Sequence, residues 1–195
     1  MKLHEIPRGH LAEVVTYLDM RDRPKPAPLP ASPLRINRWN PVDLEKYRIL
    51  FERVGAPWLW YSRLVMDDTA LDAVINHPGI RFFAVEDPKG IEIGMIELDF
   101  RETGQCEIQF FGLVPELAGA GHGRWLMQQT LALAWRPDVE CVHLHTCTLD
   151  HPNALAFYRK MGFVPRGRAV ETFPDPRLAG ILPRDAAPHV PLLEG

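Results

Sequence analysis

The chain alternates short runs rich in β-branched and aromatic residues, typical of strands, with longer segments that carry helix start and stop signals. The predicted strands are 11–20, 34–39, 81–87, 91–100, 105–114, 141–149 and 163–173. The predicted helices are 40–55, 67–79, 123–135 and 151–162. In the third of these, five residues at helical spacing form one apolar stripe: Leu126, Met127, Thr130, Leu131 and Ala134. A length of 195 residues suits one domain with extensions.

Local signals place the boundaries of these elements. We expect Asn40 to be the N-cap of the first helix, Pro41 its first residue and Gly55 its end. Alternating prolines between residues 23 and 33 favour an extended linker. The expected organisation is therefore an N-terminal extension with an extra strand and a Pro-rich linker, a central domain and a Pro-rich tail, at residues 1–33, 34–173 and 174–195.

Charge and composition exclude several classes of protein. The net charge of -3 and the absence of a long basic run argue against nucleic acid or a membrane surface as the partner. No signal peptide or membrane-spanning run is recognisable, and three scattered cysteines fit reduced thiols rather than a disulfide framework. We therefore expect a soluble cytoplasmic protein.

Three glycines at alternate positions, Gly119, Gly121 and Gly123, stand between a predicted strand and a predicted helix. Such a loop directs backbone N–H groups and the positive end of a helix at one point, which suits an anion such as a phosphate. Two common phosphate loops do not fit. The nucleoside triphosphate loop needs Gly-Lys-Ser/Thr at its end, and the dinucleotide fingerprint needs glycine where the chain has Arg124.

The run VPELAGAGHGRWLM, followed by a strand and then by HPNALAFYRKMGF, resembles the GNAT superfamily of acyl-CoA-dependent N-acyltransferases over residues 34–170. The resemblance implies an α/β (α+β) fold with a central mixed, mostly antiparallel sheet. This sheet would be splayed between its fourth and fifth strands and carry helices on both faces. It also implies acetyl-CoA as the co-substrate, with no metal.

The family's loop pattern is Gln/Arg-x-x-Gly-x-Gly/Ala, and Ala118 stands where the pattern has Gln or Arg. This departure removes one side-chain contact and leaves the backbone cradle. The residues to which the resemblance assigns cofactor contacts are Leu113, Val114, Gly119, Ala120, Gly121, His122, Gly123, Arg124 and Asn153. Many relatives carry an asparagine where this chain has His151, so either His151 or Asn153 contacts CoA.

Transfer of an acetyl group to an amine requires a base, because an ammonium group cannot attack. The histone-acetylating branch of the family has its base on the strand where this chain has Glu107, with Glu97 on the neighbouring strand as the alternative. A one-residue shift in register would exchange the faces of these strands. Tyr158 stands where the family's helix tyrosine protonates the departing sulfur.

The leading hypothesis is an N-acetyltransferase that acts on a primary amine of a small molecule or peptide, as a monomer or homodimer. Trp58, Trp60 and Tyr61 are candidates for the wall of the acceptor pocket. Two alternatives stay open, a catalytically silent acyl-CoA-binding module and a zinc protein. The zinc ligands would be the residues that alternate onto one face of HLHTC, namely His143, His145 and Cys147.

Overall fold

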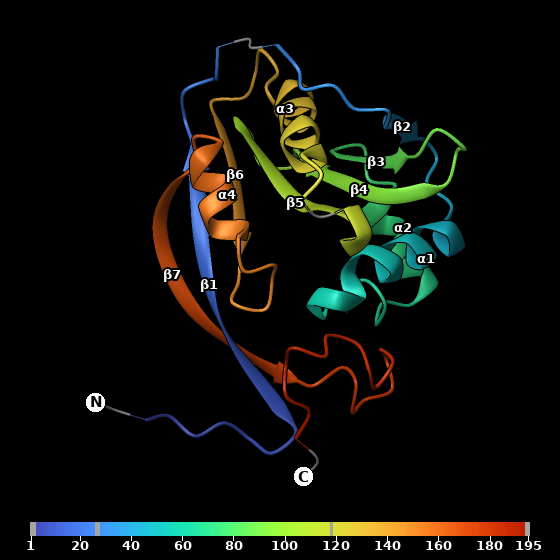
Figure 1. The fold of residues 1–195 in the computed structure, drawn as a ribbon, viewed down its shortest axis with the longest axis vertical. Coiled ribbons are helices and arrows are strands. Elements are labelled where there is room, and N and C mark those ends of the chain that lie inside the picture. The colour runs from blue at the N-terminus through green and yellow to red at the C-terminus, as the bar shows by residue number, and fades with distance from the viewer. Residues whose placement is uncertain (1–2, 26–27, 118, 194–195) are drawn as a thin grey trace.

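The computed structural model describes residues 3–25, 28–117 and 119–193, and its centre is one seven-stranded sheet in the order β2-β3-β4-β5-β6-β1-β7 (Figure 1). The strands are β1 His10–Met20, β2 Arg35–Trp39, β3 Ile80–Glu86, β4 Glu92–Asp99, β5 Gln105–Leu113, β6 Cys141–Thr146 and β7 Val164–Pro174. The α-helices are α1 Leu44–Gly55, α2 Asp68–Ile75, α3 His122–Ala134 and α4 Ala154–Lys160. Two short 3-10 helices are η1 Ala56–Trp58 and η2 Pro115–Leu117.

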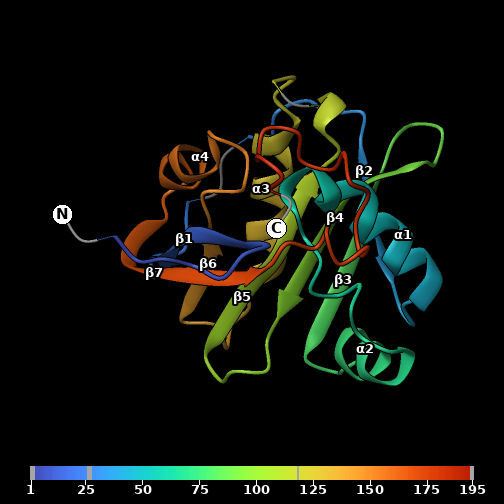
Figure 2. The same cartoon turned by 90° about the horizontal axis from the view of Figure 1, so that it is seen from below.

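Helices cover both faces of this sheet, as the resemblance implied (Figure 2). Alternation along β4 shows the division, because Met95 packs in a cluster with α1 and α2 whereas Ile96 packs in a cluster with α3. Tyr47 and Phe51 of α1 are completely buried on the first face. Leu126 and Met127 of α3, two residues of the predicted apolar stripe, are completely buried on the second.

The sheet divides between β5 and β6, which are the fourth and fifth strands when counted from residue 34. They pair in parallel at three positions, of which Glu107 opposite His143 is the last. Every other pairing in the sheet is antiparallel. The prediction of a mixed, mostly antiparallel sheet splayed between these two strands is confirmed.

The N-terminal strand β1 lies inside the sheet, between β6 and β7 (Figure 1). It pairs with β7 along its length, from His10 opposite Pro174 to Asp19 opposite Val164. On its other edge Thr16 to Met20 pair with β6. Residues that precede the Pro-rich linker therefore supply the strand that joins β6 to β7 in the sheet.

The start of α1 differs from the prediction. The helix begins at Leu44 with Asp43 as its N-cap, and a carboxylate oxygen of Asp43 accepts a hydrogen bond from the backbone N–H of Lys46 at 2.9 Å. The prediction of Asn40 as N-cap with Pro41 as first residue was wrong. A helix begins where a side-chain oxygen can accept a hydrogen bond from an unpaired backbone N–H three residues later. Asp43 supplies that oxygen.

The Pro-rich tail after β7 packs against the domain. Leu182, Ala187 and Val190 are buried in a cluster with Leu59 and Leu149. The completely enclosed Arg177 guanidinium holds the tail together, since it pairs with Asp175 at 2.7 Å and also donates to backbone carbonyls further along. These carbonyls belong to Ala186, Ala187, Val190 and Pro191.

We expect Asp175→Asn to lower the free energy of unfolding by about 1–3 kcal/mol at pH 7. The loss is limited because the carbonyls still accept from Arg177. Burial alone would raise the pKa of Asp175, but the hydrogen bonds from Arg177 outweigh it and leave the pKa below 3.8, its usual value. This stabilisation is present above the unfolded pKa and is lost as pH falls through the folded one. Urea unfolding should show a constant difference from pH 7 to 5 that shrinks below pH 4, whereas an unchanged difference would contradict the assignment.

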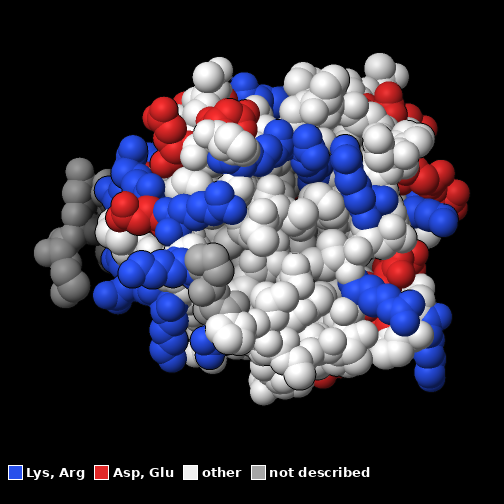
Figure 3. All heavy atoms as spheres, turned by 90° about the horizontal axis from the view of Figure 1, so that it is seen from above, with Lys and Arg blue, Asp and Glu red and all other residues white. Residues whose placement is uncertain are grey.

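Both signs of charge appear on the face of the molecule that Figure 3 shows. Seen from above, Lys and Arg side chains surround a largely uncharged area, with Asp and Glu toward the edges (Figure 3). Among the residues that the structure describes, no helix has both the length and the apolar character needed to cross a membrane.

Candidate active site

A cavity of about 540 Å³ lies where β5 and β6 diverge, a size typical of small-molecule sites. Its walls come from the turn after α1, β5, the start of α3, the end of β6, α4, β1 and β7. Many residues singled out from the sequence line it: Trp58, Trp60, Tyr61, Leu113, Val114, Gly119, Gly123, His145, Cys147, His151, Asn153 and Tyr158.

The structure places the other expected site residues around this cavity rather than on its wall. Gly121, His122 and Arg124 belong to the loop and the first turn of α3, and Arg124 is exposed. Ala120 closes a turn, with its N–H 3.4 Å from the carbonyl of Leu117. Ala118, at the departure from the family's loop pattern, lies outside the described residues.

The glycine loop forms an open cradle at the N-terminus of α3. Gly119 and Gly121 have φ of +81° and +83°, values that favour glycine, and Gly121 is the N-cap of α3. The first N–H groups of a helix have no partner within it, so this end of α3 can receive an anion. Gly123 has ordinary φ, and a Cβ there would meet nothing closer than the Phe157 ring at 4.0 Å. The space beside Gly123 therefore belongs to the cavity.

The side chain of His122 is already engaged. Its Nδ1 lies 3.2 Å from the hydroxyl oxygen of Ser32, at the end of the Pro-rich linker. This contact joins the linker to the first turn of α3. His122 would therefore contribute to the cradle through its backbone N–H.

The wall that β5 contributes includes a free strand edge. Among the described residues, pairing of β5 with β6 stops at Glu107, while Leu113 on the opposite edge still pairs with Gly94 of β4. Residues Ile108 to Leu113 line the cavity beyond that point. An unpaired edge offers backbone donors and acceptors to an extended ligand. This edge and the glycine loop lie end to end.

Tyr158 lines the cavity from α4 and is half-buried. Three phenyl rings hold its ring, those of Phe111, Phe157 and Phe163 at centroid distances of 6.3, 5.5 and 6.1 Å. Burial raises the pKa of Tyr158 well above its usual value, and the charge of Asp150 adds to this. Its hydroxyl is therefore protonated at neutral pH and can donate.

The opposite end of the cavity is acidic, a feature that the sequence did not reveal. Glu13 of β1 and Glu171 of β7 face each other across the strand pair, and both line the cavity. Burial raises the pKa of Glu13, and the charges of Glu171 and Asp150 raise it further. Like charges directly opposite each other destabilise a sheet unless something compensates them.

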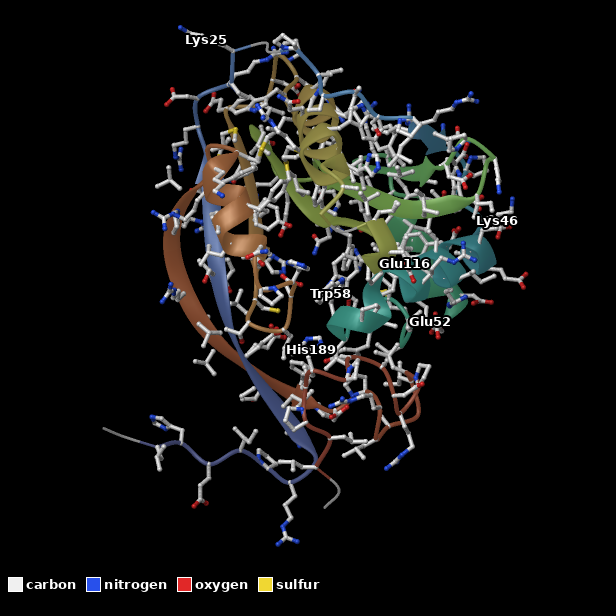
Figure 4. The ribbon with its side chains drawn as sticks, viewed as in Figure 1. Lys25, Lys46, Glu52, Trp58, Glu116 and His189 are labelled. Carbon is white, nitrogen blue, oxygen red and sulfur yellow. The ribbon has the colours of Figure 1, made fainter. Side chains whose placement is uncertain are left out.

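Asp150 joins the acidic end to the aromatic wall. Its carboxylate accepts hydrogen bonds from the Thr146 hydroxyl at 2.6 Å, the Cys147 N–H at 3.0 Å and the Trp60 indole N–H at 3.4 Å. The Trp58 ring, which lines the cavity, has its centroid 5.5 Å from that of His151. Its centroid is 5.8 Å from that of His189 in the tail (Figure 4). The tail therefore contacts the aromatic wall through His189.

The two carboxylates considered as the base lie in different surroundings. Glu97 is completely buried and accepts from the Tyr47 hydroxyl and from Arg63, both at 2.6 Å. Glu107 is partly exposed, and its Oε1 lies 3.3 Å from Nδ1 of His145. His145 lines the cavity, and neither carboxylate is among the lining residues.

The HLHTC strand was considered as a metal site. Within residues 3–25, 28–117 and 119–193, no group of three or more His, Cys, Asp or Glu side chains is arranged to hold a metal ion. Burial raises the pKa of the Cys147 thiol, which keeps it neutral.

A family model described as "Acetyltransferase (GNAT) family" matches residues 44–163, more than half of the chain. No curated protein matches the sequence. Solved structures are similar in fold. A GCN5-related N-acetyltransferase from Sphaerobacter thermophilus superposes with a TM-score of 0.65 at 16% identity, over 85% of this chain and 53% of that one. The chain thus spans about half the length of that structure.

Two further structures share the fold at low sequence identity. A putative GNAT-family acetyltransferase from Novosphingobium aromaticivorans has a TM-score of 0.54 at 18% identity, covering 87% of this chain and 68% of that one. A spermidine N-acetyltransferase chimera from Vibrio cholerae and hSSAT has a TM-score of 0.54 at 23% identity, covering 70% and 83%.

Proposed function

The chain belongs to the GNAT acetyltransferase family, and on that premise we propose that it is an N-acetyltransferase that moves the acetyl group of acetyl-CoA to a primary amine. One observation carries the proposal. A single cavity runs from the glycine cradle, at Gly119 and Gly123, to the acidic end at Glu13 and Glu171. One end suits an anion and the other a cation, as transfer between a phosphate-bearing donor and an ammonium requires.

The cradle fits the pyrophosphate of CoA. Backbone N–H groups at the start of α3 would hold phosphate oxygens. Among the described residues, a Cβ at Gly119 would meet no atom within 4 Å, and one at Gly123 would meet only the Phe157 ring at 4.0 Å. The free edge of β5, ending at Leu113, would pair with the extended arm, and Val114 and Asn153 line the cavity beside it. The thioester supplies an activated acetyl group. Tyr158, protonated and on that wall, would donate to the sulfur.

The acceptor end supports an amine. Glu13, Glu171 and Asp150 line it, and Trp58, Trp60 and Tyr61 supply apolar and aromatic walls. An ammonium ion would relieve the repulsion between the facing glutamates and can lie against aromatic faces. The spermidine enzyme of similar fold is named for a cationic amine. We therefore propose small cationic amines, with an aromatic or second charged group, as acceptors.

The test combines binding with turnover. Acetyl-CoA at ~100 times its dissociation constant should stabilise the protein by about 2.7 kcal/mol. Gly123→Val should abolish this shift, because its side chain would enter the cradle while the protein itself leaves room. Gly167→Val is the matched control, since a Cβ at Gly167 meets no described atom within 4 Å and Gly167 is not among the residues that line the cavity. Gly121→Val is a poorer test, because φ of +83° would strain any branched residue.

Turnover is measured as thiol release from acetyl-CoA with a panel of amines that includes spermidine, putrescine, phenylethylamine and a lysine peptide. Release with at least one amine supports the proposal. No thermal shift with millimolar acetyl-CoA would overturn the assignment of the donor. A shift without release for any amine would indicate a silent acyl-CoA-binding module.

A further inference from the structure

We infer that His145 takes the proton from the amine and that Glu107 is the positioning residue that holds His145. The inference rests on the proposed N-acetyltransferase function and assigns the base within it. Glu107, the expected base, reaches the cavity through this imidazole, with its Oε1 3.3 Å from Nδ1 of His145.

The strands place His145 at the fork of the sheet. Val142 and Leu144 of β6 pack in the core cluster with α3, so His143 and His145 face the other side. Pairing of β5 with β6 ends at Glu107 opposite His143. His145 is two residues past this point, where the strands have separated, and its side chain is 41% exposed. The fork thus gives the imidazole access to the cavity.

The contact with Glu107 determines which nitrogen of His145 can act as a base. An ionised carboxylate only accepts hydrogen bonds, so its Oε1 at 3.3 Å favours the neutral tautomer of His145 that carries the hydrogen on Nδ1. The lone pair is then on Nε2, which Glu107 does not contact. The ring of Tyr17, the partner of His145 on β1, lies 6.3 Å away and packs against the imidazole from the other strand. Glu107 and Tyr17 together fix the orientation of the ring.

The electrostatics favour the imidazole over the carboxylate as the proton acceptor. The hydrogen bond from His145 lowers the pKa of Glu107 against the opposing effect of burial, so Glu107 binds a proton more weakly than a free carboxylate. The same bond raises the pKa of His145 above 6.5, again against burial. Asp150 from the following loop and Glu13 from β1 raise it further. A base is most effective when its pKa is close to the working pH.

The ammonium gives one proton to Nε2 of His145 and becomes a neutral amine. The amine nitrogen forms the C–N bond to the acetyl carbon as the C–S bond of the thioester breaks. This nitrogen then carries one hydrogen more than the amide, and it loses that proton to solvent. Tyr158 donates its proton to the sulfur and is reprotonated from solvent, and His145 releases its proton to solvent. One proton is released per amide and free thiol formed.

A first experiment uses the ligand-free protein. Histidine is labelled with ¹⁵N, and the His145 signals are assigned from their absence in His145→Gln. In wild type we expect His145 to titrate above 6.5, with Nδ1 protonated in the neutral ring. Glu107→Gln should lower this pKa, and Glu107→Asp should restore part of the shift. An unchanged pKa and tautomer in Glu107→Gln would overturn the positioning role.

A second experiment measures single-turnover thiol release against pH, with whichever amine of the panel wild type accepts. His145→Gln should lose ~10²-fold or more at pH 7. Glu107→Gln should lose less there, and its acid limb should move to lower pH in parallel with the NMR titration. His77→Gln, at an exposed histidine that is not among the residues lining the cavity, should remain close to wild type. Thermal shift with acetyl-CoA confirms that each variant is folded.

The outcomes separate the two levels of the proposal. Absence of release by wild type with every amine would refute the proposed function itself. Release by wild type with an unaffected His145→Gln would refute only the role of His145. A larger loss in Glu107→Gln than in His145→Gln, without a shifted acid limb, would make the carboxylate the direct base.

Discussion

Tyr158→Phe is expected to slow single-turnover thiol release by ~10²-fold or more, while the thermal shift with acetyl-CoA stays close to that of wild type. The variant removes one hydroxyl and keeps the ring, which packs against Phe111, Phe157 and Phe163. Burial and nearby charges, rather than a hydrogen bond within the described residues, set the surroundings of this hydroxyl, so its loss should affect chemistry rather than stability.

The pH dependence gives this prediction a second readout. Burial raises the pKa of Tyr158, so its hydroxyl stays protonated throughout an assay from pH 6 to 9. The deficit of Tyr158→Phe should therefore be nearly constant over that range. Tyr17→Phe is the control, because it removes a hydroxyl outside the cavity wall and keeps the ring that packs against His145. Equal single-turnover rates for Tyr158→Phe and wild type would remove Tyr158 from the reaction.

Much of the fold was predictable because its signals are local. Strand-forming runs, helix stop signals and the glycine loop lie within a few residues of the features they determine. The splayed sheet was predicted from the resemblance to the family. The error at α1 is also local, since both Asn40 and Asp43 are good N-caps and only the structure shows that Asp43 accepts from Lys46. Local signals predict the existence of a helix or strand more reliably than they predict the residue at which it begins.

The acidic end of the cavity depends on pairing between distant parts of the chain. Glu13 faces Glu171 because β1 pairs with β7, and no local pattern in residues 11–20 indicates that partner. Tyr158 and the glycine loop could be found from the sequence, because they belong to motifs. His145 drew attention as a possible metal ligand, and its contact with Glu107 became visible only when the fork between β5 and β6 was known.

The position of Glu97 shows why register matters. It is on β4 next to β5, and the sequence alone left it as an alternative to Glu107. In the structure a register irregularity in β5 lies opposite Glu97 and Leu98, and Phe110, the partner of Glu97, packs with α1 and α2. Glu97 is directed into that packed layer, where Tyr47 and Arg63 bind it. This environment predicts a structural role.

Glu97→Gln is expected to lower the free energy of unfolding by about 3–5 kcal/mol, because it leaves the Arg63 charge buried without its counter-charge. Arg63 is 10% exposed in its side chain and Glu97 is completely buried. Burial lowers the pKa of Arg63, but the charge of Glu97 more than offsets it and keeps the guanidinium charged. Burial and the charge of Glu97 raise the pKa of Tyr47, which keeps its hydroxyl a donor.

Urea unfolding of wild type and Glu97→Gln at pH 7 measures this loss, with Asp68→Asn as the matched control. Asp68 pairs with Arg48 at 2.7 Å but is 78% exposed in its side chain, so water replaces that pair and the cost should stay within about 1 kcal/mol. The triple variant Glu97→Leu, Arg63→Met, Tyr47→Phe removes both charges and the hydroxyl that donates to Glu97. It should recover much of the stability, since apolar side chains can fill the same space. Equal losses for Glu97→Gln and Asp68→Asn would mean that water reaches Arg63, and Glu97 would again be a candidate for the base.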